Sequence, residues 1–177
     1  MKVDQYQQLA RTTAIYPSKI VYPALGLIGE CGEVVDKLFY TPYSEEEVLQ
    51  EAGDLCWYMA NLAYDCDSSL SKCIESDSFE IIENTFSGTS EIIAELLINL
   101  GAIAEIVKKA LRDENGVFSN NRKKRIVEYI RIIHDTLTVY VSSVTGEPTL
   151  ERSAILNVEK LKSRQERDVL KGDGDDR

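Results

Sequence analysis

The sequence predicts an all-α fold, a helical bundle built as one domain over residues 1–177. Apolar residues recur at i, i+3 and i+4 along most of the chain, which is the period of an amphipathic helix. The isoleucine- and valine-rich stretch 126–133 keeps this spacing and does not alternate as a strand would. With 44% hydrophobic residues, a chain of 177 residues can bury a substantial core.

The helical pattern divides the chain into eight segments. They are residues 3–15, 19–39, 45–65, 68–75, 79–86, 90–112, 120–145 and 149–170. Residues 40–44 form a connector, and Ser44 is a suitable N-cap ahead of three glutamates. Residues 113–116 predict a turn, and Gly146 with Pro148 predicts the end of one helix and the start of the next.

Charge and cysteine content narrow the class of protein. The formal net charge of −10 argues against a nucleic-acid polymer as partner, although a small nucleotide is compatible if metals neutralise its phosphates. No apolar run approaches the roughly 20 residues of a membrane span, and the first residues begin no signal peptide. The four cysteines lack a C-x-x-C spacing, so we interpret them as reduced thiols of a cytoplasmic protein.

Two helical runs each carry an acid-x-x-acid pair, Glu30 with Glu33 and Glu51 with Asp54. Three residues turn a helix by roughly 300°, so both acids of a pair share one face. Two such pairs, bordered by apolar residues, would face each other only with cations between them. Hard carboxylate oxygens select Mg²⁺ or Mn²⁺, so the four acids predict a metal site between two helices.

Glycines stand beside these acids, at Gly29, Gly32 and Gly53. Each costs a helix roughly 1 kcal/mol relative to alanine. That cost indicates a place where another backbone or a ligand approaches closely. An isolated acid-x-x-acid pair is usually solvated helix surface, and the glycines distinguish these two pairs from that case.

The stretch from Tyr22 to Glu33, followed by the stretch from Glu51 to Tyr58, resembles the MazG-like nucleoside triphosphate pyrophosphohydrolases. Their signature is E-x-x-E, a spacer and E-x-x-D. The carboxyl-terminal stretches 157–164 and 172–177 also resemble the ending of that family. The resemblance implies an all-α homo-oligomer, a dimer or tetramer, with two or more Mg²⁺ or Mn²⁺ ions per site. It implies cleavage of a (deoxy)nucleoside triphosphate to monophosphate and pyrophosphate.

The Tyr-Pro-Ala-Leu-Gly run from Tyr22 to Gly26 and the carboxyl-terminal Gly-Asp-Gly-Asp resemble viral members of the family. Some of those act on dGTP, which favours a guanine substrate. A viral protein of this kind would lie in the host cytoplasm.

Within this interpretation the metal ligands are Glu30, Glu33, Glu51 and Asp54. One glutamate, Glu33 in the first place and Glu30 otherwise, would orient or deprotonate the attacking water, and spacing leaves the choice open. The phosphate-binding candidates are Lys160, Arg164, Lys109 and Arg112.

Base recognition has three candidates. Tyr58 lies one helical turn beyond Asp54, and Tyr40 follows the first acid pair by two turns, so either ring would pack on a sugar or base. Asn157 matches a residue that the family places near the nucleotide. We interpret Trp57 as a core residue, because it adjoins Tyr58 and points elsewhere.

A shift of 72 residues places one part of the chain on another. The residues Gly29, Glu33, Val35 and Lys37 then coincide with Gly101, Glu105, Val107 and Lys109. The second unit has Ala102 where the first has Glu30. This predicts a duplicated pseudo-dimer, with residues 1–75 as the metal-binding half and 76–177 as the phosphate-contacting half. Chance similarity of two amphipathic helices would give the same coincidence.

Three alternatives compete with the hydrolase. A di-iron bundle usually requires Glu-x-x-His on two helices, and the single histidine, His134, excludes it. A non-catalytic helical module would use the acids as surface and bind another protein. The same fold would also serve an enzyme of another phosphorylated nucleotide.

Overall fold

The computed structural model describes residues 1–39, 44–74 and 86–171, without the side chains of residues 38 and 39. Within these ranges the protein is all-α, with seven helices and no strand. The helices are α1 (Val3–Thr12), α2 (Val21–Phe39), α3 (Glu45–Asp65), α4 (Leu70–Ile74), α6 (Thr89–Asp113), α7 (Asn120–Thr145) and α8 (Glu151–Glu166). The predicted fold class is thereby confirmed. The predicted connector 40–44 and helix 79–86 lie, except for their last residues, outside the described residues.

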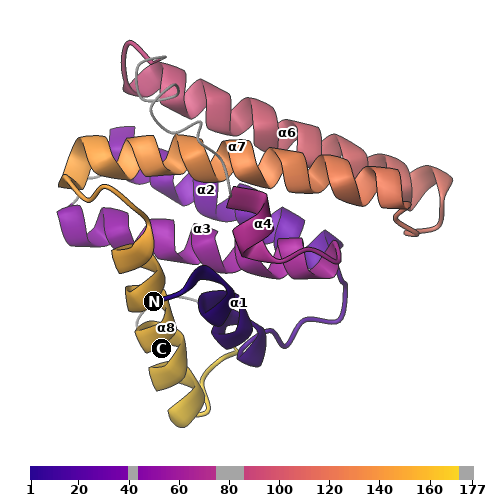
Figure 1. The fold of residues 1–177 in the computed structure, drawn as a ribbon, viewed down its shortest axis with the longest axis horizontal. Helices are drawn as coiled ribbons and strands as arrows, with labels where there is room; N and C mark the ends of the chain where they lie inside the picture. The colour runs from indigo at the N-terminus through magenta and orange to yellow at the C-terminus, as the bar shows by residue number, and fades with distance from the viewer. Residues whose placement is uncertain (40–43, 75–85, 172–177) are drawn as a thin grey trace.

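Two helical hairpins form the body of the protein (Figure 1). One consists of α2 and α3 and the other of α6 and α7; α3 packs against α7, and α2 packs against α6. The short helices α1 and α4 and the last helix, α8, all contact α3 or its neighbours. The order of the two hairpins accords with the predicted duplication. Because any up-and-down four-helix bundle contains two hairpins, the duplication stays a prediction.

Helix α3 lies at the centre of the fold. It contacts α1, α2, α4, α7 and α8, so its side chains are buried on nearly every side. Its apolar core residues include Leu49, Leu55, Met59 and Leu62, each at most 1% exposed. A charged residue in the amino-terminal half of α3 therefore enters the protein interior, where burial without a partner is unfavourable.

Local signals set some of the helix ends. The Ser44 hydroxyl accepts from the Glu47 N–H and the Glu47 carboxylate accepts from the Ser44 N–H, which is the predicted cap. Gly146 ends α7 in the left-handed region at φ 73°. The prediction of a first helix extending to residue 15 was too long. The Thr13 hydroxyl donates to the Ala10 carbonyl at 3.0 Å and accepts from Trp57 Nε1 at 2.9 Å, so a tertiary contact accompanies the end of α1.

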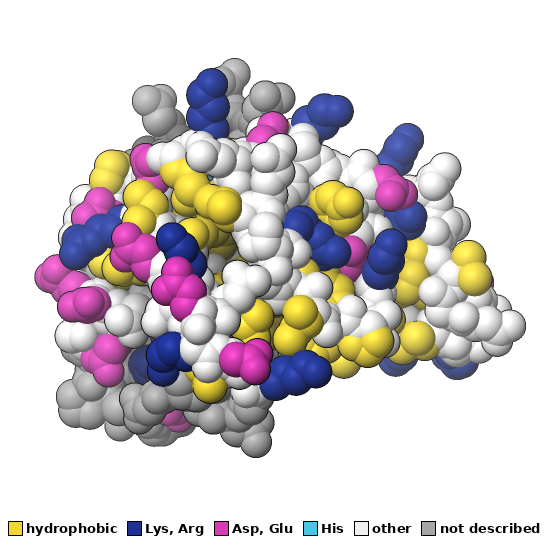
Figure 2. Space-filling model, turned by 90° about the horizontal axis from the view of Figure 1, so that it is seen from below, with side chains coloured by type: hydrophobic (Ala, Val, Ile, Leu, Met, Phe, Trp, Pro, Cys, Tyr) yellow, Lys and Arg dark blue, Asp and Glu magenta, His cyan; other side chains and the backbone are white. Residues whose placement is uncertain are grey.

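The side of the molecule that carries α1 and α8 has a mixed surface. Figure 2 shows acidic, basic and apolar side chains interspersed over its described part, with no field of a single sign. In the described part of the chain, no helix combines the length and apolarity needed to cross a membrane.

Candidate metal centre

Three of the four predicted acids come together between α2 and α3. Glu30 on α2 and Glu51 and Asp54 on α3 each offer one carboxylate oxygen, and these oxygens lie within 4.8 Å of one another. Because α3 is central, Glu51 is only 4% exposed, while Glu30 and Asp54 are partly exposed. Three hard oxygen donors at this spacing fit a cation such as Mg²⁺ or Mn²⁺.

The fourth acid, Glu33, lies outside this group. It is exposed on α2, three residues beyond Glu30. Its charge nevertheless reaches Glu30, since it helps to raise the pKa of that carboxyl group. Glu33 therefore stands at the solvent side of the acidic group.

Two lysines and one asparagine accompany the three carboxylates. Lys160 on α8 pairs with Asp54 Oδ2, and Asn157 Nδ2 donates to Asp54 Oδ1 at 2.7 Å. Lys37 on α2 pairs with Glu51. Lys160 and Asn157 were predicted to bind substrate, and the structure places both directly on Asp54, a predicted metal ligand. Lys37 was not predicted, although its spacing of seven residues from Glu30 puts both on one face of α2.

Glu30 carries the perturbed titration of the site. Burial first, and then the charges of Asp54, Glu33 and Glu51, raise its pKa from 4.5 to about 8, against the lowering effect of Lys160. Between about pH 4.5 and about pH 8, Glu30 therefore stays protonated in the folded state, whereas it has released its proton in the unfolded state. The stability that the raised pKa of Glu30 contributes is fully present below about pH 4.5 and is lost as the pH rises through about 8.

This titration predicts that metal affinity depends on pH. A cation bound to Glu30 must displace its proton, so the apparent affinity for Mn²⁺ should rise by up to about tenfold per pH unit below pH 8 and level off above it. Calorimetric titrations in two buffers of different ionisation enthalpy would measure the affinity and the proton release. The Glu30→Gln variant should lose this dependence. An affinity independent of pH in the wild-type protein would remove Glu30 from the ligand set.

The other predicted phosphate-binding residues lie in two separate parts of the structure, one on α8 and two on α6. Arg164 is 5% exposed and follows Lys160 by one turn of α8, on the side of the molecule that carries Asn157. Lys109 and Arg112 lie at the end of α6, where they pair with Glu105 at 3.2 Å and Asp113 at 2.6 Å. In the described part of the chain α6 contacts α7 and α2 but neither α3 nor α8. Figure 1 shows this end of α6 at the far right, away from α8. The structure therefore does not bring Lys109 and Arg112 to the acids.

The two predicted aromatic candidates differ. Tyr40 lies outside the described residues. Tyr58 is half-buried beside the acids, and burial first, then Tyr22, Glu30 and Asp54 raise its pKa above the usual range. Its ring packs directly on Gly26, where an added Cβ would lie 2.0 Å from a ring carbon. Trp57 is buried and donates to Thr13, which confirms its predicted core role.

The glycines beside the acids have different surroundings. A Cβ on Gly53 would lie 2.5 Å from the backbone oxygen of Ser153, so α8 approaches α3 at this residue. Here the expected close approach of a backbone is confirmed. A Cβ added to Gly29 or Gly32 would have no atom of another part of the described chain within 4 Å. Among the described residues, therefore, no other backbone comes close to Gly29 or Gly32, and the approach of a ligand there stays a prediction.

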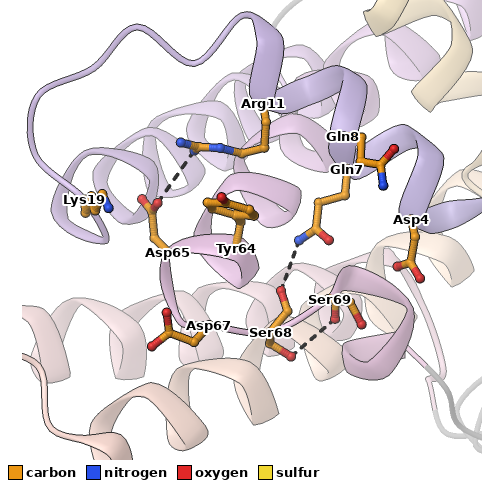
Figure 3. Close-up of a pocket in the computed structure, with 10 residues that line it drawn as sticks. All are labelled: Asp4, Gln7, Gln8, Arg11, Lys19, Tyr64, Asp65, Asp67, Ser68 and Ser69. Carbon is orange, nitrogen blue, oxygen red and sulfur yellow. Dashed lines mark hydrogen bonds and ion pairs between the residues drawn. The ribbon is translucent and has the colours of Figure 1, made fainter.

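A cavity of about 790 Å³ lies at the other end of α3 (Figure 3). It is lined by α1, by Lys19, and by the end of α3 with the residues that follow it, and none of the predicted site residues lines it. Arg11 pairs with the buried Asp65 at 3.6 Å and covers the ring of Tyr64 at 4.5 Å. Asp65 also accepts from the Tyr16 hydroxyl and the Ile20 N–H, each at 3.0 Å. These bonds attach the segment before α2 to α3, which gives the cluster a structural role.

The chain is similar to the Gene 37 protein of Mycobacterium phage L5. The two are 35% identical over 88 residues, which cover 40% of this chain and 77% of the phage protein. The chain belongs to one family with that protein, whose name states no activity. No family model and no solved structure matches the chain. A phage homologue is thus confirmed, and the MazG-like type stays a prediction.

Proposed function

We propose that the protein is a (deoxy)nucleoside triphosphate pyrophosphohydrolase of the MazG-like type. It would use Mg²⁺ or Mn²⁺ to convert a triphosphate and water to a monophosphate and pyrophosphate. The observation that supports this most directly is the meeting of carboxylate oxygens from Glu30, Glu51 and Asp54 within 4.8 Å. Lys160 and Asn157, both on Asp54, place a cation and an amide donor beside the same group.

The chemistry of the site suits a polyphosphate. The negative charges of a polyphosphate oppose the approach of the attacking oxygen and repel the acids of the site, so positive charge must offset them before attack. Glu30, Glu51 and Asp54 would hold a divalent ion, which would supply this positive charge, polarise a phosphoryl oxygen and lower the pKa of a bound water. Lys160 would bind a phosphate oxygen by a charge-assisted hydrogen bond. Glu33, exposed beside the ligands, would accept the proton of the attacking water as the α–β anhydride is split.

A panel of the eight common NTPs and dNTPs with Mg²⁺ tests this proposal. We expect monophosphate and pyrophosphate in equal amounts, with dGTP the best substrate if the viral resemblance extends to base choice. Chromatography of the products measures both. Release of orthophosphate, or no product from any of the eight nucleotides, would contradict the proposed activity.

One observation favours the alternative of a non-catalytic helical module. Lys37 and Lys160 already pair with Glu51 and Asp54, so two of the acids have cationic partners within the chain. In that case the acids would only join α2, α3 and α8. The calorimetric titration with Mn²⁺ separates the two functions, since the module would bind no metal at any pH.

A further inference from the structure

One face of α2 joins an aromatic residue to the acids. Tyr22, Gly26 and Glu30 follow one another at intervals of four residues, so they lie along one side of the helix. Tyr22 precedes Glu30 by about 12 Å along the axis, because each residue rises about 1.5 Å. Across the hairpin α3 presents Tyr58 against Gly26 and Asp54 near Glu30. Tyr22 and Glu30 therefore lie on one side of α2, with the Tyr58 ring packed on Gly26 between them.

Tyr22 is the exposed ring at the aromatic end. It is 45% exposed, and the neighbouring Leu25 is 61% exposed. The Tyr22 ring stacks on Tyr16, with centroids 4.9 Å apart and planes 11° apart, and Tyr58 lies 6.3 Å away at 40°. Two rings thus fix its orientation while nearly half of the residue meets solvent. A fixed aromatic surface loses little entropy when it binds a ligand.

Tyr58, in contrast, is only partly exposed. Its ring lies against Gly26 and meets Trp57 edge-on, with centroids 4.9 Å apart. It supports Tyr22 and leaves less surface for a ligand. The predicted base-stacking role therefore suits Tyr22 better than Tyr58.

We propose that the base of the substrate stacks on Tyr22 while its phosphates reach the acids at Glu30. The inference rests on the proposed function and specifies the substrate as a nucleotide recognised through its base, as opposed to an inorganic polyphosphate. The distance along α2 is of the order of the length of an extended nucleotide. Gly29, with no described atom within 4 Å of an added Cβ, leaves the intervening surface open for the sugar.

Calorimetry with two ligands in Mn²⁺ tests the inference without turnover. The first is a deoxyguanosine triphosphate analogue with a non-cleavable α,β-imido bridge, and the second is inorganic tripolyphosphate, which has no base. Tyr22→Ala should weaken binding of the analogue by about 5- to 150-fold, the range for stacking of one base on an aromatic ring. Its affinity for tripolyphosphate should not change. Tyr22→Phe should bind both ligands as the wild-type protein does.

Leu97→Ala is the matched control, because Leu97 is an apolar residue of similar exposure, 51%, on α6, which in the described part of the chain contacts neither α3 nor α8. It should leave both affinities unchanged. If Tyr22→Ala fails to fold in a thermal melt, Tyr22→Leu takes its place, since leucine keeps apolar bulk against Tyr16. If Tyr22→Ala binds the analogue as tightly as the wild-type protein does, or loses affinity for both ligands equally, the role of Tyr22 in base stacking is overturned. The proposed function is not affected by that result. Failure of the wild-type protein to bind either ligand would overturn the proposed function as well.

Discussion

Glu51→Gln is expected to slow pyrophosphate release at least about 100-fold while the protein stays folded. The Glu51 side chain is 6% exposed and supplies one of the three oxygens that meet between α2 and α3. Glutamine has the same size but no charge to balance a divalent ion. Loss of a partner that only orients a metal ligand costs about 10- to 100-fold, so loss of a ligand itself should lower kcat/KM by at least about 100-fold. Pyrophosphate release at saturating Mg²⁺ and the Kd for Mn²⁺ measure the effect.

The stability of this variant should change less than its activity. Lys37 loses its ion pair with Glu51, but its side chain is 27% exposed and can turn toward water. Glu105→Gln is the matched control. Glu105 pairs with Lys108 and Lys109 on the surface of α6, so its replacement should leave activity and metal binding unchanged. If Glu51→Gln keeps wild-type turnover, Glu51 is no ligand and the proposed site is wrong.

Gly53→Ala is expected to lower the free energy of unfolding by about 1–3 kcal/mol, the usual penalty of overpacking. The added Cβ would lie 2.5 Å from the Ser153 oxygen and 3.0 Å from the Asn157 Cβ, and both belong to α8. A backbone atom yields less readily than a flexible side chain, so α8 must move away from α3. Asn157 and Lys160 would then leave Asp54, and activity should fall together with stability. Urea unfolding and pyrophosphate release measure the two effects.

Gly101→Ala is the matched control for this change. Gly101 lies within α6, and no described atom would lie within 4 Å of its added Cβ. Alanine there should raise the free energy of unfolding by up to about 1 kcal/mol, because it favours the helix over glycine. Replacement of glycine by alanine should thus lower the free energy of unfolding at Gly53 and raise it at Gly101. A stabilising Gly53→Ala would show that α8 does not pack against α3 at this residue.

Local signals were sufficient for most of the fold. Helical periodicity predicted α2, α3, α6 and α7 within a residue or two, and the Ser44 cap and Gly146 set two of their ends. The end of α1 was missed because the side chain that bonds there, Trp57, is 44 residues away in the sequence. No local pattern contains that contact.

In the candidate site, too, the sequence predicted what lies within one helix and missed what depends on contacts between helices. The sequence by itself determined that Glu30 and Glu33 share one side of α2 and that Glu51 and Asp54 share one side of α3, because helix period fixes such pairs. The packing of α2 on α3 decided that Glu30 enters the group of carboxylates while Glu33 stays at the surface.

Tertiary structure alone decided which basic and aromatic side chains accompany the acids. The chain path brings Lys37 and Lys160 to the carboxylates and holds Tyr22 on Tyr16. It leaves Lys109 and Arg112 with α6, paired to acids of their own helix. The physical reason is that periodicity within one helix fixes only relative directions on that helix. The distance between two helices, and the rotation of each about its axis, depend on the apolar surfaces that they bury together.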